Sequence, residues 1–137
     1  MKKILVVILV IFSVLVFSIA NKKYKAHVLE QQAIAEEKAA IDRAEKAIRS
    51  LLKDPDSGKF TEAAFNKKTG AVCGNVNAKN SYGGYVGFLP YIVTSSGTAM
   101  ISPPDPNVAG TFDFERYQNL VRFLDMHKEM CSALKGQ

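Results

Sequence analysis

The chain has 137 residues, of which 47% are hydrophobic and 23% are charged, and its net charge is +5. These proportions exclude an intrinsically disordered chain, because disorder requires low hydrophobicity together with high charge. The charge gives no support for nucleic-acid binding, since the excess is +2 in residues 1–21 and +3 in residues 22–53, while residues 54–137 are neutral. The basic residues therefore gather beside the apolar N-terminus, which favours a membrane surface as their partner.

Residues 4–20 form an apolar run that only two serines interrupt, and Lys2 and Lys3 precede it. As a helix this run is about 25 Å long, slightly shorter than a typical hydrocarbon core. We interpret it as an uncleaved anchor in the inner membrane. The alternative is a signal peptide that is cleaved after Ala20. Both interpretations place the rest of the chain in the periplasm.

Residues 24–53 are predicted to form one long amphipathic helix, because alanine, glutamate, lysine and glutamine dominate and no glycine or proline interrupts. Ile34, Ile41 and Ile48 recur every seven residues and form one stripe. We expect the C-terminal half of this helix, residues 40–52, to pack on a folded domain and the N-terminal half to act as a stalk. A homodimer through residues 24–53 is the alternative. Pro55 ends the helix.

Four strands are predicted after this helix, at residues 59–65, 71–78, 88–94 and 98–102, with turns at 66–70 and 95–97. Pro90 lies within the third strand, which predicts an edge position or a bulge there. Residues 103–110 are rich in proline and are expected to form a connecting loop.

A closing helix is predicted in residues 111–136, with Thr111 or Asp113 as its N-cap and Gly136 at its end. An apolar stripe runs along it; its members are Phe114, Tyr117, Leu120, Val121, Leu124, and Met130 or Cys131. The predicted fold class is α+β, with an N-terminal membrane helix, a long amphipathic helix, a four-stranded antiparallel meander and a C-terminal helix. Residues 1–21 form the anchor or signal peptide, residues 22–53 form the amphipathic helix or stalk, and residues 54–137 form the small α+β domain.

The chain has two cysteines, Cys73 and Cys131. In an exported protein such a pair predicts a disulfide, which here would add roughly 4 kcal/mol of stability to a small core. Two free buried thiols and a catalytic or metal-binding role are the alternatives. A metal site at His127 and Cys131 is formally possible from their four-residue spacing, but no further ligand follows at helical spacing.

Enzymatic chemistry has little support, because the acidic residues are scattered over turns and helix faces and no phosphate-binding motif is present. We therefore predict no catalytic residue, no metal and no cofactor. The main candidate for binding is the connection between the second and third strands, which offers amide, hydroxyl and aromatic groups. Its candidate residues are Asn77, Asn80, Ser81, Tyr82, Gly83, Gly84 and Tyr85. The same composition also suits a tight connection between strands.

The strings "LKDPDSGKF" and "VCGNVNAKNSYGGYVGF", followed by a helix that ends in a cysteine, resemble a group of small exported or membrane-anchored proteins of proteobacteria and their prophages. The resemblance covers residues 50–134. It implies a shared fold and an envelope location, with Cys73 and Cys131 as the bridge, and it carries no catalytic residue. We expect a non-catalytic periplasmic binding module whose partner is an envelope or phage protein. The alternatives are a prophage protein that interferes with superinfection and a small carbohydrate-active hydrolase.

Overall fold

The computed structural model describes residues 2–104, 106 and 113–132, and for residues 2–10 it describes only the backbone. It contains two α-helices, one 3-10 turn and a four-stranded sheet. In chain order the elements are α1 (Lys2–Arg49), η1 (Pro55–Ser57), β1 (Lys59–Phe65), β2 (Val72–Asn77), β3 (Leu89–Val93), β4 (Ala99–Ile101) and α2 (Phe114–Cys131). The predicted α+β class is confirmed.

The chain divides into two compact units, one that ends at Lys38 and one that begins at Ala39. The first unit consists of the part of α1 up to Lys38, and α1 runs without a break from the apolar run into the amphipathic segment, where it ends at Arg49, four residues before the predicted end at residue 53. Within the part of the chain whose side chains are described, no helix combines the length and the apolar character that a membrane crossing requires. The second unit contains the end of α1, the whole sheet and α2.

The sheet is an antiparallel meander with strand order β1-β2-β3-β4, as predicted. Its interior strands are β2 and β3, which pair from Val72 opposite Val93 to Val76 opposite Leu89. β1 and β4 form the two edges. The observed strands lie within one residue of the predicted bounds, since alternation of apolar residues and clear turn residues mark them in the sequence.

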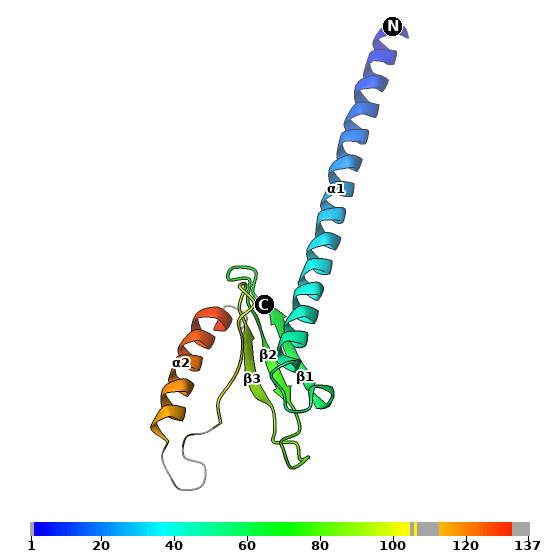
Figure 1. Cartoon of the computed structure of the whole chain (residues 1–137). Helices are drawn as coiled ribbons and strands as arrows, with labels where there is room; N and C mark the ends of the chain where they lie inside the picture. The colour runs from blue at the N-terminus through cyan, green and yellow to red at the C-terminus, as the bar shows by residue number, and fades with distance from the viewer. Residues whose placement is uncertain (1, 105, 107–112, 133–137) are drawn as a thin grey trace. The chain divides into compact units, whose positions relative to one another are not determined.

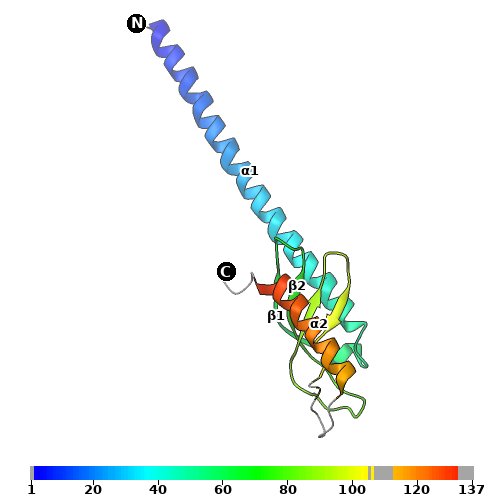
Figure 2. The same ribbon diagram turned by 90° about the vertical axis from the view of Figure 1, so that its left-hand side faces the viewer.

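Both faces of the sheet are covered, one by the end of α1 and the other by α2 (Figures 1 and 2). On the first face, Ala44 and Ile48 of α1 are buried against strand residues, and Ala40, Ile41 and Leu52 pack around them. This confirms the expectation that the second half of the amphipathic helix packs on the domain. On the second face, Phe123 of α2 packs with Ile92 and the two cysteines.

The predicted disulfide joins Cys73 of β2 to Cys131 at the end of α2, with 6.0 Å between the Cα atoms. A second tether lies beside it, because the buried Asn66 donates from Nδ2 to the Met130 carbonyl at 2.6 Å. Thr69 donates to the same carbonyl oxygen at 3.3 Å. The C-terminal end of α2 is therefore held by a covalent bond and by the turn between β1 and β2.

The apolar stripe predicted along the last helix forms its buried face only in part, since Cys131 is buried and Leu120 and Met130 are half-buried. Phe114, Tyr117, Val121 and Leu124 are exposed, whereas Phe123 is buried. Phe123 packs with Ile92 and the two cysteines, and the partly buried Met126 and Met130 lie against this cluster. Asp113 caps the helix as predicted, accepting from the Arg116 amide at 3.0 Å. Thr111, Gly136 and most of the connecting loop 103–110 lie outside the described residues.

The prediction that Pro90 marks an edge strand or a bulge is wrong. β3 is an interior strand, and Pro90 lies in regular register opposite Asn75. On its other side, the Pro90 carbonyl accepts from the Ser102 amide at 2.8 Å, just beyond the end of β4. A residue with an N–H at position 90 would donate toward β4, at the last pair of the β3–β4 pairing. Proline therefore costs the sheet only one hydrogen bond at the end of that pairing.

Tyr91 occupies the centre of the core on the α1 side. Its ring meets Phe60 edge-on with 5.8 Å between centroids, and it lies across Gly74, its partner in the register. A Cβ at position 74 would lie 2.7 Å from the Tyr91 hydroxyl oxygen, so only glycine leaves room for the ring. This hydroxyl is buried without a hydrogen-bond partner among the described residues. Burial, and secondarily the charge of Glu45, raises the pKa of Tyr91 to about 12.

Because of Tyr91, the stability of the domain is expected to decrease with rising pH in the alkaline range. The folded protein keeps the Tyr91 proton where the unfolded chain releases it, so the free energy of unfolding falls as the pH rises from about 10 to about 12. The slope is up to about 1.4 kcal/mol per pH unit. Tyr91→Phe removes this slope and leaves stability at pH 7 unchanged or higher, because it removes an unsatisfied hydroxyl. Urea unfolding at several pH values, with Tyr82→Phe as the exposed control, measures the difference. An equal slope in Tyr91→Phe contradicts the assignment.

Candidate binding surface

The connection between β2 and β3 is a small ordered hairpin. Lys79 and Tyr85 form an isolated antiparallel bridge, and Asn80 closes the turn that they enclose. The Asn80 side-chain oxygen accepts from the amides of Tyr82 at 2.9 Å and Gly84 at 3.1 Å. Gly83 has φ +80°, a conformation that favours glycine. The tip of the loop is therefore built by its own asparagine and glycine.

Two further candidate residues attach this hairpin to the domain. Asn77 accepts from the Gly87 amide at 3.2 Å. The Tyr85 hydroxyl donates to the Ser57 carbonyl at 3.2 Å, and the buried Ser57 hydroxyl accepts from the Lys79 amide at 3.0 Å. Asn77 and Tyr85 therefore serve to position the loop.

The remaining candidates lie at the tip. Tyr82 is 96% exposed, and Ser81 and Gly84 are exposed beside it. An aromatic side chain held out on an ordered turn provides a large contact area at low conformational entropy. Of the predicted binding residues, Tyr82 thus offers the large side chain that is directed to solvent.

A hollow of about 170 Å³ lies between this loop and the end of α1, and we call it the loop hollow. Its lining is apolar apart from two lysines and one asparagine. The lining residues are Leu51, Leu52, Lys53, Val76, Ala78, Lys79, Asn80, Val86, Gly87, Leu89 and Ile101. None of the described lining residues is acidic. The hollow therefore has an apolar lining with lysines at its rim.

Large apolar side chains surround this hollow in exposed positions. Val86 and Leu51 line it and are more than half exposed, and Phe88 is half exposed next to it in the chain. Sequence reasoning missed Val86 and Phe88, because they were assigned to the end of the connection and the start of a strand. In the structure both flank Gly87, which has φ +100°, and both lie outside β3, which begins at Leu89.

The basic groups on this surface are also arranged around an aromatic ring. The Lys59 ammonium lies 4.3 Å from the centroid of the Tyr85 ring, and that of Lys79 lies 5.9 Å from it. Such contacts hold cations close to an aromatic face. Asp54 and Asp56 of the neighbouring turn do not line the loop hollow. The surface therefore combines an exposed tyrosine, an apolar hollow and lysines.

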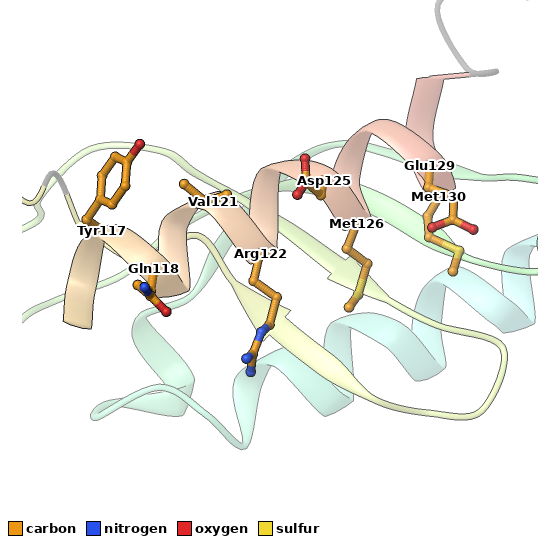
Figure 3. A pocket seen from close by; sticks show the side chains of 8 residues that line it. All are labelled: Tyr117, Gln118, Val121, Arg122, Asp125, Met126, Glu129 and Met130. Atoms are coloured by element: carbon orange, nitrogen blue, oxygen red, sulfur yellow. The ribbon is translucent and has the colours of Figure 1, made fainter. Parts of the chain in front are cut away.

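A larger hollow of about 620 Å³ follows the outer surface of α2. All of its described lining residues belong to this helix, and Figure 3 shows Gln118, Arg122 and Met126 pointing to one side while Tyr117 points to the other.

Over residues 2–104, 106 and 113–132, no three metal-ligating side chains come together. Cys131 is engaged in the disulfide and does not pair with His127 as a metal ligand. Ser57, which follows two aspartates in the sequence, is buried and donates to the Asp54 carbonyl at 2.7 Å.

Comparison of the chain with models of protein families, with curated proteins and with solved structures finds no match. The geometry of the surface itself therefore carries the functional argument.

Proposed function

We propose that this protein is a non-catalytic binding module that recognises an envelope or phage protein through its β2–β3 loop and the loop hollow. The observation that carries the proposal is the 96% exposure of Tyr82 on a turn that Asn80 holds in place. Interfaces depend on such anchors, because rigid aromatic side chains that become buried supply much of the binding energy. Residues 4–20 would hold the module in the inner membrane with its domain in the periplasm.

The loop hollow specifies the chemistry of the partner. Its apolar lining would receive a hydrophobic side chain, and Lys53 and Lys79 at its rim would attract acidic residues next to that side chain. The expected partner is therefore a protein segment in which an apolar residue is flanked by aspartate or glutamate. An interference with superinfecting phage is compatible with this chemistry if the partner is a phage protein.

The hydrolase alternative expects the loop to line a pocket that contains Asp56 or Glu115. Neither residue lines the loop hollow, and the tip of the loop projects into solvent instead. General acid–base catalysis of glycoside hydrolysis uses two facing carboxylates. We therefore retain binding as the proposed function.

A photoreactive amino acid at position 82 of the full chain tests this function in cells. We expect a crosslinked product from position 82 and none from position 96, an exposed serine in the β3–β4 turn at the opposite end of the sheet. The product should disappear when Val86→Asp is introduced into the same protein, because the hollow then repels an apolar or acidic group. Lys79→Glu should weaken it through charge reversal.

The control variant Ser96→Asp should leave the crosslink at position 82 intact. A product that persists in Val86→Asp would show that the hollow has no part in recognition. A product that forms from position 121 on α2 and not from position 82 would move the binding surface to the other hollow and overturn the proposal.

A further inference from the structure

The interior of β1 contains a backbone conformation that its residue does not favour. Glu62 has φ +55°, in the left-handed region, at a bulge where the register of β1 and β2 shifts between Thr61 and Ala64. Glycine and asparagine adopt this region with little strain, whereas glutamate has no such advantage. A bulge alone protects an edge strand from unwanted pairing, but that purpose does not require a glutamate. Strained residues of this kind concentrate at functional sites.

The bulge turns Glu62 toward a neighbouring strand. Its Oε2 atom accepts from the side-chain amide of Asn75 on β2 at 2.7 Å. Among the described residues Glu62 makes no ion pair, so no described neighbour neutralises its negative charge. The carboxylate is exposed and can interact with a ligand through its other oxygen.

Glu62 forms one wall of a hollow of about 310 Å³, which we call the Glu62 hollow. It lies on the face of the sheet that carries α2, away from the cluster that packs against α1. The lining residues are Glu62, Ala64, Cys73, Gly74, Asn75, Pro90, His127 and Cys131. The hollow is well anchored, since the disulfide joins two of its walls and Pro90 stands opposite Asn75 in the sheet.

The charge and size of this hollow define a ligand class. Glu62 is the only acidic group in the described lining, and no lysine or arginine contributes to it. Ala64, Pro90 and the disulfide offer apolar surface beside the carboxylate. The volume is at the lower end of the range for small-molecule sites, about 300 to 1,000 Å³. We propose that the Glu62 hollow binds a primary ammonium group on a short alkyl chain, with Glu62 as the charge partner.

This ligand chemistry occurs both in free amines and in the lysine side chain of a polypeptide. The Glu62 hollow and the loop hollow share no lining residue. Binding of an amine is therefore independent of the proposed recognition of a protein through the loop, and either can fail without the other.

Titration of the full-length ¹⁵N-labelled chain in a neutral detergent tests the proposal, with the side-chain amide of Asn75 as the reporter. Pentane-1,5-diamine should shift this signal saturably with a Kd on the order of 1 mM, whereas pentane-1,5-diol of equal length should not. Glu62→Gln should weaken diamine binding by about tenfold or more, because it removes the charge of the acceptor. Glu115→Gln, a change of another exposed glutamate, should leave it unchanged.

A second probe separates the two sources of the ammonium group. Tighter binding of Nα-acetyl-lysine methylamide than of the diamine indicates a lysine of a partner polypeptide, and the reverse indicates a free amine. Three results would overturn the proposal: no shift of the Asn75 amide, equal shifts with diamine and diol, or full diamine binding by a Glu62→Gln protein whose spectrum shows it to be folded.

Discussion

Removal of the disulfide between Cys73 and Cys131 is expected to lower the free energy of unfolding of the domain by about 4 kcal/mol. The bond spans 58 positions, so its loss gives the unfolded chain a large gain in conformational freedom. Among the described residues, α2 is otherwise held by the packing of Phe123 and by the hydrogen bonds of Asn66 and Thr69 to the Met130 carbonyl. For a domain of this size, the expected fall in Tm is roughly 15–30 °C.

Thermal unfolding of the full-length chain, followed by near-ultraviolet circular dichroism of its tyrosines, measures this effect with and without reductant. The double variant Cys73→Ala/Cys131→Ala should unfold at the low temperature in both conditions and thus serves as the control for unspecific effects of the reductant. Hydrogen exchange should also accelerate in α2 before it does in β2 and β3. A fall in Tm of less than about 5 °C would show that the hydrogen bonds of Asn66 and Thr69 hold α2 without the bond.

Ile48→Ala is expected to destabilise the same domain by about 2–5 kcal/mol. Ile48 is 0% exposed and packs with Val72, Val76 and Tyr91 on the α1 face of the sheet. The loss of its side chain leaves a cavity that the surrounding strands cannot close. The matched control is Ile34→Ala, because Ile34 belongs to the same seven-residue stripe but is 56% exposed. Its effect should stay within about 0.5 kcal/mol.

Urea unfolding of the two variants at several protein concentrations decides between packing on the sheet and a helical dimer. If α1 packs on its own sheet, only Ile48→Ala lowers the unfolding midpoint, and the midpoint does not depend on concentration. A dimer through residues 24–53 instead makes the midpoint rise with protein concentration, and Ile34→Ala then destabilises as well. Equal destabilisation by the two substitutions would contradict the assignment of Ile48 to the core.

The strands of the sheet were predictable because their signals are local. Residues 59–65 match β1, and the turn residues after it fall where the chain reverses, with Gly70 at φ +70°. The meander follows from short connections, which join neighbouring antiparallel strands. The cysteine pair was predictable for a different reason, since an even count in an exported chain favours a bridge whatever the fold.

The orientation of α2 was not predictable from its pattern. Phe114, Tyr117, Val121 and Leu124 give a regular apolar stripe but are exposed, whereas Phe123 packs with Ile92. Periodicity records which residues share a face of a helix and not which face meets the core, whenever apolar residues cover more than one side. The position of Pro90 was missed for a related reason. An interior strand tolerates a proline where the neighbouring strand ends, and the end of β4 is not visible in the sequence around Pro90.

The candidate site was predictable in its location and only partly in its residues. The composition of the β2–β3 connection indicated a loop with exposed polar and aromatic groups, and Tyr82 has that position. The roles of Asn77, Asn80 and Tyr85 became clear from hydrogen bonds to Gly87, to the turn and to Ser57, which the sequence does not contain as a pattern. Leu51 and Val86 meet at one hollow although 35 positions separate them.

By itself, the sequence determined the order and bounds of the strands, the long N-terminal helix and the pairing of the two cysteines, whereas α1 ends at Arg49 and not at the predicted residue 53 before Pro55. The helix and the strands depend on backbone propensities and on the alternation of apolar and polar residues, which act over short distances. The cysteine pairing depends only on the number of cysteines. The tertiary structure alone decided which face of α2 is buried, how the loop is held and where Glu62 points. Each of these depends on contacts between segments that are distant in the chain, and such contacts outweigh local preference when a shared core or a covalent bond fixes the geometry.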